Sequence, residues 1–167
     1  MDKELIKGLI AEYQQFVKSV SFVKRAVTLS DNFNYVFVGL RRVGKSYLMY
    51  QQIHHLIETG ISPEEILFFN FEDERIAGMD TEHLDMIKRC YEEMYSHRPI
   101  FFLDEIQIVP HWEQFVRRLA DQKYRVYVTG SNAKMLSKDI ATTLGGRFMI
   151  QYVLSLIHIS EPTRPRL

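Results

Sequence analysis

Cysteine and net charge are both scarce in this sequence of 167 residues. Cys90 stands alone, which excludes an internal disulfide and a zinc site built on cysteines, and we expect it to be a small buried hydrophobe. The 21 basic and 21 acidic residues give a formal net charge of zero. No overall charge therefore points to nucleic acid or to an anionic membrane surface.

Long apolar runs are missing as well. No stretch approaches the length of a transmembrane helix, and the charged start, Met1-Asp2-Lys3-Glu4, is not followed by the apolar region of a signal peptide. We therefore expect a cytoplasmic location and no membrane partner. The composition, 46% hydrophobic and 25% charged, is ordinary for a globular protein, and the length suits one domain with a sizeable core.

The sequence does contain one stretch with the pattern G-x-x-x-x-G-K-S of a phosphate-binding P-loop, at residues 39–46. An apolar run precedes it and a helical pattern follows, which is the order that the motif requires. Lys45 is predicted to reach the β- and γ-phosphates of a nucleotide, and the Ser46 hydroxyl to bind Mg²⁺. Backbone N–H groups and the start of the helix would complete the anion site. The predicted nucleotide-binding residues are Gly39, Leu40, Arg41, Arg42, Val43, Gly44, Lys45, Ser46 and Tyr47.

A second informative stretch is the apolar run 100–103, which ends in Asp104 and Glu105. A strand that delivers carboxylates at its end is the Walker B pattern that accompanies a P-loop. Asp104 is predicted to hold Mg²⁺, and Glu105 to act as the general base or to orient water for attack on the γ-phosphate. The acid pair is typical of ATPases, and the absence of an Asn-Lys-x-Asp motif argues against a GTPase.

Three further sets of polar residues have two interpretations each. Asn132 or Ser131, after the strand expected at 124–129, would be a sensor that bonds the γ-phosphate or the attacking water, or would cap the next helix. Arg147 would be an arginine finger that acts on a neighbouring subunit's nucleotide, or an ordinary surface arginine. The charged segment 72–75 would approach the nucleotide and its metal, or would be a solvated loop.

Hydrophobic periodicity predicts an α/β fold: an open, mostly parallel sheet of about five strands with helices on both faces, the P-loop NTPase class. The Walker B strand should lie beside or near the P-loop strand, because both must reach one Mg²⁺. The apolar stripe of the first helix would pack on the sheet or face another domain. Helices are expected at 1–27, 45–59, 81–95, 110–122 and 133–140, with a single turn at 62–65, and strands at 35–38, 66–71, 100–103, 124–129 and 148–153.

Together these stretches resemble AAA-type P-loop ATPases of bacteria and archaea, ATP-binding proteins in which a C-terminal domain of unknown function follows the ATPase core. The resemblance covers roughly residues 20–153. It implies ATP and Mg²⁺ as ligands, and it implies that Lys45, Ser46, Asp104, Glu105 and Asn132 have the roles given above, with Arg147 as the finger. The resemblance rests on residues 39–46, 63–73, 102–107, Trp112, 129–132 and 146–148.

The sequence departs from that family after residue 153. Residues 154–164 match, one by one, the in-frame translation of a transposase-based sequencing adapter; the alternative is a natural tail rich in proline and arginine. The expected organisation is an N-terminal helical segment at 1–27, a truncated ATPase core at 28–153 and a non-native tail at 154–167.

The expected function is ATP binding and Mg²⁺-dependent ATP hydrolysis. One alternative is a nucleotide-gated switch or interaction module with little turnover, whose output passes through the missing C-terminal region or a partner. A DNA-associated ATPase is a weaker alternative, which the neutral charge disfavours. The missing region would mediate assembly into a homo-oligomer or binding to a protein partner.

Overall fold

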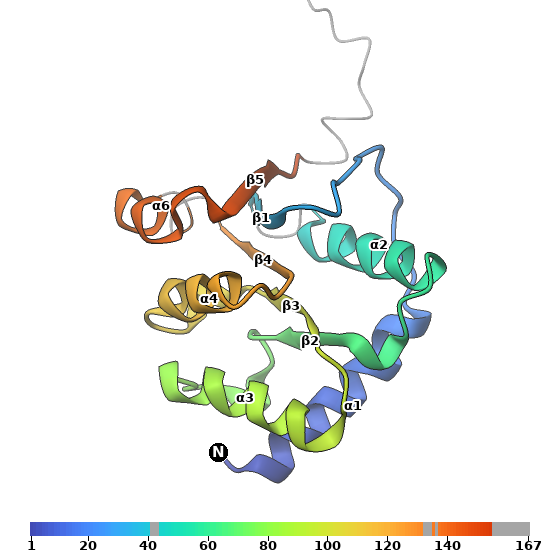
Figure 1. Ribbon diagram of the computed structural model, residues 1–167, viewed down its shortest axis with the longest axis vertical. Helices are drawn as coiled ribbons and strands as arrows, with labels where there is room; N and C mark the ends of the chain where they lie inside the picture. The colour runs from blue at the N-terminus through green and yellow to red at the C-terminus, as the bar shows by residue number, and fades with distance from the viewer. Residues whose placement is uncertain (41–43, 132–134, 136, 155–167) are drawn as a thin grey trace, which may run out of the picture.

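The fold is built on a sheet of five strands. The computed structural model describes residues 1–40, 44–131, 135 and 137–154. The strand order is β2-β3-β4-β1-β5, and every neighbouring pair is parallel (Figure 1). This confirms the predicted sheet. The strands are β1 (Asn34–Val38), β2 (Ile66–Asn70), β3 (Ile100–Asp104), β4 (Val126–Gly130) and β5 (Phe148–Tyr152).

Helices cover both faces of the sheet, as predicted. In Figure 1, α2 lies on one face, α4 and α6 lie on the other, and α1 and α3 lie beside the β2 end. No helix in the described part of the chain is long and apolar enough to cross a membrane. The helices are α1 (Lys3–Ser19), α2 (Lys45–Glu58), α3 (Thr81–Met94), α4 (Trp112–Asp121) and α6 (Lys138–Leu144), with short 3₁₀ turns η1 (Pro63–Glu65), η2 (Glu74–Ile76), η3 (Ile106–Ile108) and η4 (Gly145–Arg147).

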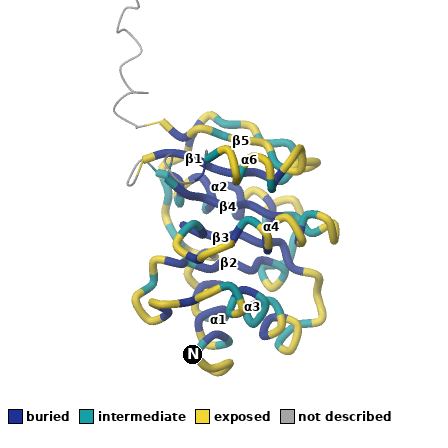
Figure 2. Tube along the Cα trace, turned by 90° about the vertical axis from the view of Figure 1, so that its left-hand side faces the viewer, coloured by how far each residue is buried: buried dark blue, intermediate teal, exposed yellow. Residues whose placement is uncertain are grey.

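The central strands are buried on both faces because helices cover both sides, which explains their continuous apolar sequences. Figure 2 shows this buried layer running through the middle of the molecule. Aromatic rings stack across it: the ring of Tyr127 lies 4.5 Å from that of Phe102 and 6.1 Å from that of Tyr35, centroid to centroid. Such cross-strand pairs help to fix the register of neighbouring strands.

The first helix packs on the sheet, which settles where its apolar stripe lies. Tyr13 meets the rings of Phe68 and Phe69 on β2 edge-on, at 5.9 and 5.3 Å. The prediction that the helix continues to residue 27 is wrong, because α1 ends at Ser19. The residues beyond Ser19 are rich in β-branched and aromatic types, which lose side-chain freedom in a helix. Phe16, although it has the helical spacing of the apolar residues in this helix, is 45% exposed.

Two later helix boundaries also differ from prediction. The helix expected at 133–140 is not continuous: Met135 is helical, Ser137 is not, and α6 starts at Lys138, where the Ser137 side chain accepts a hydrogen bond from Ile140 N–H and caps it. Residues 132–134 and 136 lie outside the described part. Helix α4 starts at Trp112 rather than Pro110, because His111 has a left-handed backbone with φ of 59°.

Candidate functional site

The candidate site lies where three parallel strands end. β1 leads through the predicted P-loop into α2, and β3 and β4 end at the same edge of the sheet, with Val38 opposite Gly130. β4 lies between β1 and β3, so the Walker B strand is near the P-loop strand rather than beside it. In open α/β sheets this edge is where ligands bind.

Gly44 begins α2 in a conformation that suits glycine. Its φ is 96°, in the left-handed region, and its carbonyl accepts the hydrogen bond from Leu48 N–H that starts the helix. A Cβ atom at this position would lie 2.6 Å from Nη2 of Arg25. Both the backbone and the close packing of Arg25 therefore require glycine here.

Lys45 is buried and has two partners in the site. Its Nζ donates to the carbonyl of Gly39 over 2.9 Å and lies 3.1 Å from Oε2 of Glu105. The side chain is only 3% exposed. The ammonium group is thus held between the two chain segments where the predicted phosphate contacts would form.

Asp104 accepts hydrogen bonds from two hydroxyl groups. Ser46 Oγ donates to its Oδ2 over 2.7 Å, and Thr129 Oγ1 donates to its Oδ1 over 2.6 Å. Burial raises the pKa of this carboxyl to about 6, while the two hydrogen bonds oppose the rise and the nearby charges of Glu105 and Glu72 add to it. The Asp104 carboxyl therefore binds a proton at a higher pH than an ordinary aspartate does, unless a cation stabilises its charge.

Glu105, the residue after Asp104, has a left-handed backbone with φ of 56°. Its N–H donates to Thr129 Oγ1 over 2.8 Å, so one threonine hydroxyl contacts both acids of the predicted pair. Its Oε1 accepts a hydrogen bond from Gln107 Nε2 over 2.8 Å. Both carboxylate oxygens of Glu105 are engaged, because Oε2 faces Lys45.

The donor set fits a magnesium ion. Mg²⁺ prefers oxygen ligands and is usually held by one or two carboxylates together with water and substrate phosphates. The Asp104 carboxylate and the Ser46 hydroxyl supply two such oxygens at hydrogen-bond distance from each other. These two residues are the ones that would hold the ion.

Other predicted residues lie elsewhere. Leu40 and Tyr47 are 66% and 41% exposed, at the rim of the site. Arg147 precedes β5 and pairs with Asp121 over 2.6 Å, so it lies at the amino ends of the parallel strands, whereas Lys45 lies beyond their carboxyl ends. Arg41, Arg42, Val43 and Asn132 lie outside the described residues.

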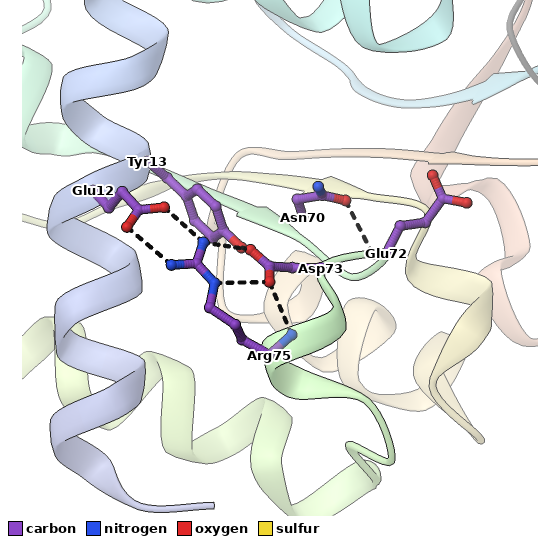
Figure 3. A network of polar contacts seen from close by, with 6 residues as sticks. All are labelled: Glu12, Tyr13, Asn70, Glu72, Asp73 and Arg75. Carbon is purple, nitrogen blue, oxygen red and sulfur yellow. Dashed lines mark hydrogen bonds and ion pairs between the residues drawn. The ribbon is translucent and has the colours of Figure 1, made fainter.

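The acidic segment after β2 divides between two environments (Figure 3). Asp73 accepts from the hydroxyl of Tyr13 over 2.6 Å and from Arg75, which also pairs with Glu12 of α1. This cluster joins the segment to α1. Glu72 extends away from it and lies close enough to Asp104 to raise the pKa of that carboxyl.

Three residues at the site were not identified from the sequence: Thr129, Gln107 and Arg25. Thr129 and Gln107 touch the acid pair. The guanidinium of Arg25 packs on Gly44 and donates to the carbonyl of Leu154 over 2.8 Å. The contacts of Thr129 and Arg25 join segments that are distant in the sequence, which a single sequence does not reveal, whereas Gln107 contacts Glu105 from only two positions away.

A cavity of about 290 Å³ opens beside the first turn of α2. Leu48, the segment 24–27 and the chain at 151–154 line it. The backbone of Arg25 exchanges two hydrogen bonds with the side chain of Gln51, at 2.7 and 3.0 Å, which ties this segment to α2. The cavity is therefore walled by the helix that follows the predicted P-loop.

Comparison with known proteins gives concordant results. A family model described as an AAA domain matches residues 31–161. An uncharacterized protein of Methanocaldococcus jannaschii is 33% identical over 156 residues, covering 92% of this chain and 34% of that protein. An uncharacterized protein of Haemophilus influenzae is 35% identical over 133 residues, covering 77% of this chain and 33% of that protein. The chain thus spans about a third of the length of these curated relatives, 34% and 33%.

Proposed function

Because the chain belongs to the AAA domain family, whose domains bind nucleotides in the manner of ATPases, we propose that it binds Mg–ATP and hydrolyses it. One observation carries the proposal. Lys45 and Ser46 begin α2, and Asp104 and Glu105 stand at the end of β3, yet contacts of 3.1 Å or less link Lys45 to Glu105 and Ser46 to Asp104.

The chain's own residues would bind the triphosphate. The Lys45 ammonium would pair with phosphate oxygens, which compete with Glu105 and the Gly39 carbonyl for the same group. The positive end of α2 would face the phosphates. A magnesium ion held by Ser46 and Asp104 would neutralise charge on the phosphate oxygens.

Glu105 would orient the attacking water and accept its proton. Its carboxylate lies at the end of β3 beside Lys45, where a γ-phosphate would be bound. We further propose the sensor role for Asn132 or Ser131, and the role of Arg147 as a finger that serves a neighbouring subunit. The position of Arg147, far from this chain's own Lys45, suits action on another copy.

The cavity beside α2 would take the nucleoside. Its apolar wall from Leu48 and Val153 suits the faces of a base, and the backbone of residues 24–27 offers hydrogen-bonding groups. Because α2 carries both Lys45 and Leu48, one helix would place the phosphates and the base together. This position favours a nucleotide over free phosphate as the ligand.

ATP binding and phosphate release measured on one sample test the proposal. We expect Mg²⁺-dependent release, and we expect Lys45→Ala to weaken ATP binding at least about tenfold because a charge-assisted contact is lost. Lys18→Ala, which removes an exposed lysine at the end of α1, is the matched control and should bind normally. Full ATP affinity in Lys45→Ala would overturn the site.

A switch with little turnover is the second candidate. The contact between Lys45 and Glu105 favours it, because phosphate oxygens that draw the ammonium away would rearrange the site without any chemistry. ATP binding without phosphate release would support the switch and contradict the ATPase.

The full-length protein would supply the output. We propose that a region beyond this chain carries the contacts to a protein partner or to further copies, since the curated relatives are about three times longer, the chain covering 34% and 33% of them. We also propose that residues 154–164 are an adapter translation, although the family match extends to residue 161. Sequencing the genomic locus across residue 153 decides this, and a locus that encodes the same residues refutes it.

A further inference from the structure

Gln107 is a partly buried contact of Glu105 to which the proposed function gives no role. It lies in η3, two positions after Glu105. We propose that Gln107 is a positioning residue that holds the Glu105 carboxylate in place when Lys45 turns to a phosphate. The inference rests on the proposed function, because Glu105 must be the group that orients water.

Glu105 has one fixed contact and one that a ligand would compete for. Gln107 Nε2 donates to its Oε1 over 2.8 Å, and Lys45 Nζ lies 3.1 Å from its Oε2. Phosphate oxygens would attract the charged Lys45 ammonium more strongly than Gln107, whose neutral amide makes weaker hydrogen bonds. The Gln107 contact is therefore the one that can persist during the reaction, while Oε2 becomes available to water.

The far end of Gln107 is enclosed, which limits its movement. Its Oε1 is buried and has no hydrogen-bond partner in the part of the chain that the structure describes. A Cβ atom added to Gly130 would lie 2.6 Å from this oxygen and 2.4 Å from the side chain of Met135. The end of β4 and Met135 thus hold the amide group in a fitted space.

The orientation of the amide follows from chemistry. The Glu105 carboxylate can only accept, so the NH₂ group must face it, and the amide oxygen must then face Gly130. A buried oxygen without a partner is unfavourable, and folded proteins leave few of them. The buried Gln107 oxygen is such a case. The hydrogen bond that the Gln107 NH₂ group donates to Glu105 gives a reason for an amide at this position.

Gln107→Met tests the inference, because methionine has a similar length and volume but no donor. We expect the rate of phosphate release at saturating ATP to fall about 10- to 100-fold, since a mispositioned base loses much of its effect, with the Kd for ATP changed less than about twofold. Gln114→Met, at an exposed position of α4, is the matched control and should leave both quantities unchanged.

A double variant separates positioning from general damage. In the Glu105→Gln background, Gln107→Met should lower single-turnover hydrolysis by less than about twofold, because Gln107 acts only through Glu105. An unchanged rate in Gln107→Met, or an equal loss in both backgrounds, overturns the inference.

A structure of the chain with Mg²⁺ and a non-hydrolysable ATP analogue tests the inference without relying on activity. We expect the Gln107–Glu105 hydrogen bond to remain within about 3.2 Å, and Lys45 to move beyond about 4 Å from Glu105. Loss of the Gln107 contact refutes the inference. A wild-type chain that releases no phosphate but keeps this contact contradicts the proposed hydrolysis alone.

Discussion

Thr129 joins the two acids of the site through a single hydroxyl. Its Oγ1 donates to Asp104 and accepts from the N–H of Glu105, and the residue is fully buried. Burying the Asp104 carboxylate is unfavourable unless it is hydrogen-bonded, so this hydroxyl and that of Ser46 make its position tenable. The geometry of the acid pair thus depends on a residue with no charge of its own.

Replacing Thr129 by valine should damage both stability and the site. The change leaves Asp104 Oδ1 and Glu105 N–H without a partner in a buried place, which should lower the free energy of unfolding by about 1–3 kcal/mol. Thr129→Ser keeps the hydroxyl and should lose much less. Urea unfolding of the two variants checks this, and equal stability of both would contradict it.

Asp104→Asn should stabilise the chain at pH 8 in the presence of a chelator. Burial raises the pKa of Asp104 to about 6, above its value in the unfolded chain, so the charged carboxyl disfavours folding at higher pH. We expect a gain of about 1–3 kcal/mol at pH 8 that shrinks as the pH falls from about 6 to about 4. Urea unfolding across this range measures it, and a gain that grows at low pH would refute the assignment.

The same substitution should remove the Mg²⁺ dependence of ATP binding. Asparagine keeps one oxygen but loses the charge that a divalent cation requires. Stability and ligand binding would then change in opposite directions, which is expected where a charge is buried for function.

At the scale of elements, the segment after β2 fastens α1 to the sheet. The hydrogen bonds from Arg75 hold the pKa of Asp73 well below its usual range, and the hydroxyl of Tyr13 contributes (Figure 3). Arg75 also reaches Glu12 on α1 with two hydrogen bonds. The ion pairs of Arg75 thus reinforce the aromatic contacts of Tyr13 between α1 and β2.

Asp73→Asn should therefore destabilise the chain at neutral pH, by about 1–3 kcal/mol. Because the folded pKa is depressed, the contribution of Asp73 is present above its unfolded value of about 4 and is lost as the pH falls below that. The stability difference between wild type and variant should narrow below pH 4. Thermal unfolding at pH 7 and pH 3 measures it, and a difference independent of pH would contradict this account.

The elements show what one sequence can reveal. Local signals were sufficient for the P-loop pattern, the strand that ends in Asp104 and Glu105, and the parallel sheet. The role of Thr129 depends on which strand lies between β1 and β3, and strand order is a long-range property. Gln107 contacts Glu105 from only two positions away, and the sequence does not show that this contact forms. The end of α1 was placed too late because apolar residues continue past Ser19, although the residues there have a lower helix propensity.

At the scale of the whole molecule, the site lies at the carboxyl ends of the strands, and β5 is the edge strand next to β1. Met149, Ile150 and Tyr152 of this edge strand are about half exposed, at 46%, 48% and 55%. Arg147 and Asp121 lie at the amino ends of the strands, and Lys45 lies beyond their carboxyl ends. An arginine finger at Arg147 would therefore have to serve the nucleotide of another copy rather than this chain's own.

Glu105→Gln gives the most direct test of the central claim, that this molecule hydrolyses ATP through Glu105 at the end of β3. ATP affinity and Mg²⁺-dependent phosphate release should be measured on the same preparation of wild type and variant. We predict that release falls at least about 100-fold in the variant while the Kd for ATP changes less than about twofold. A variant that releases phosphate as fast as the wild type would contradict the claim.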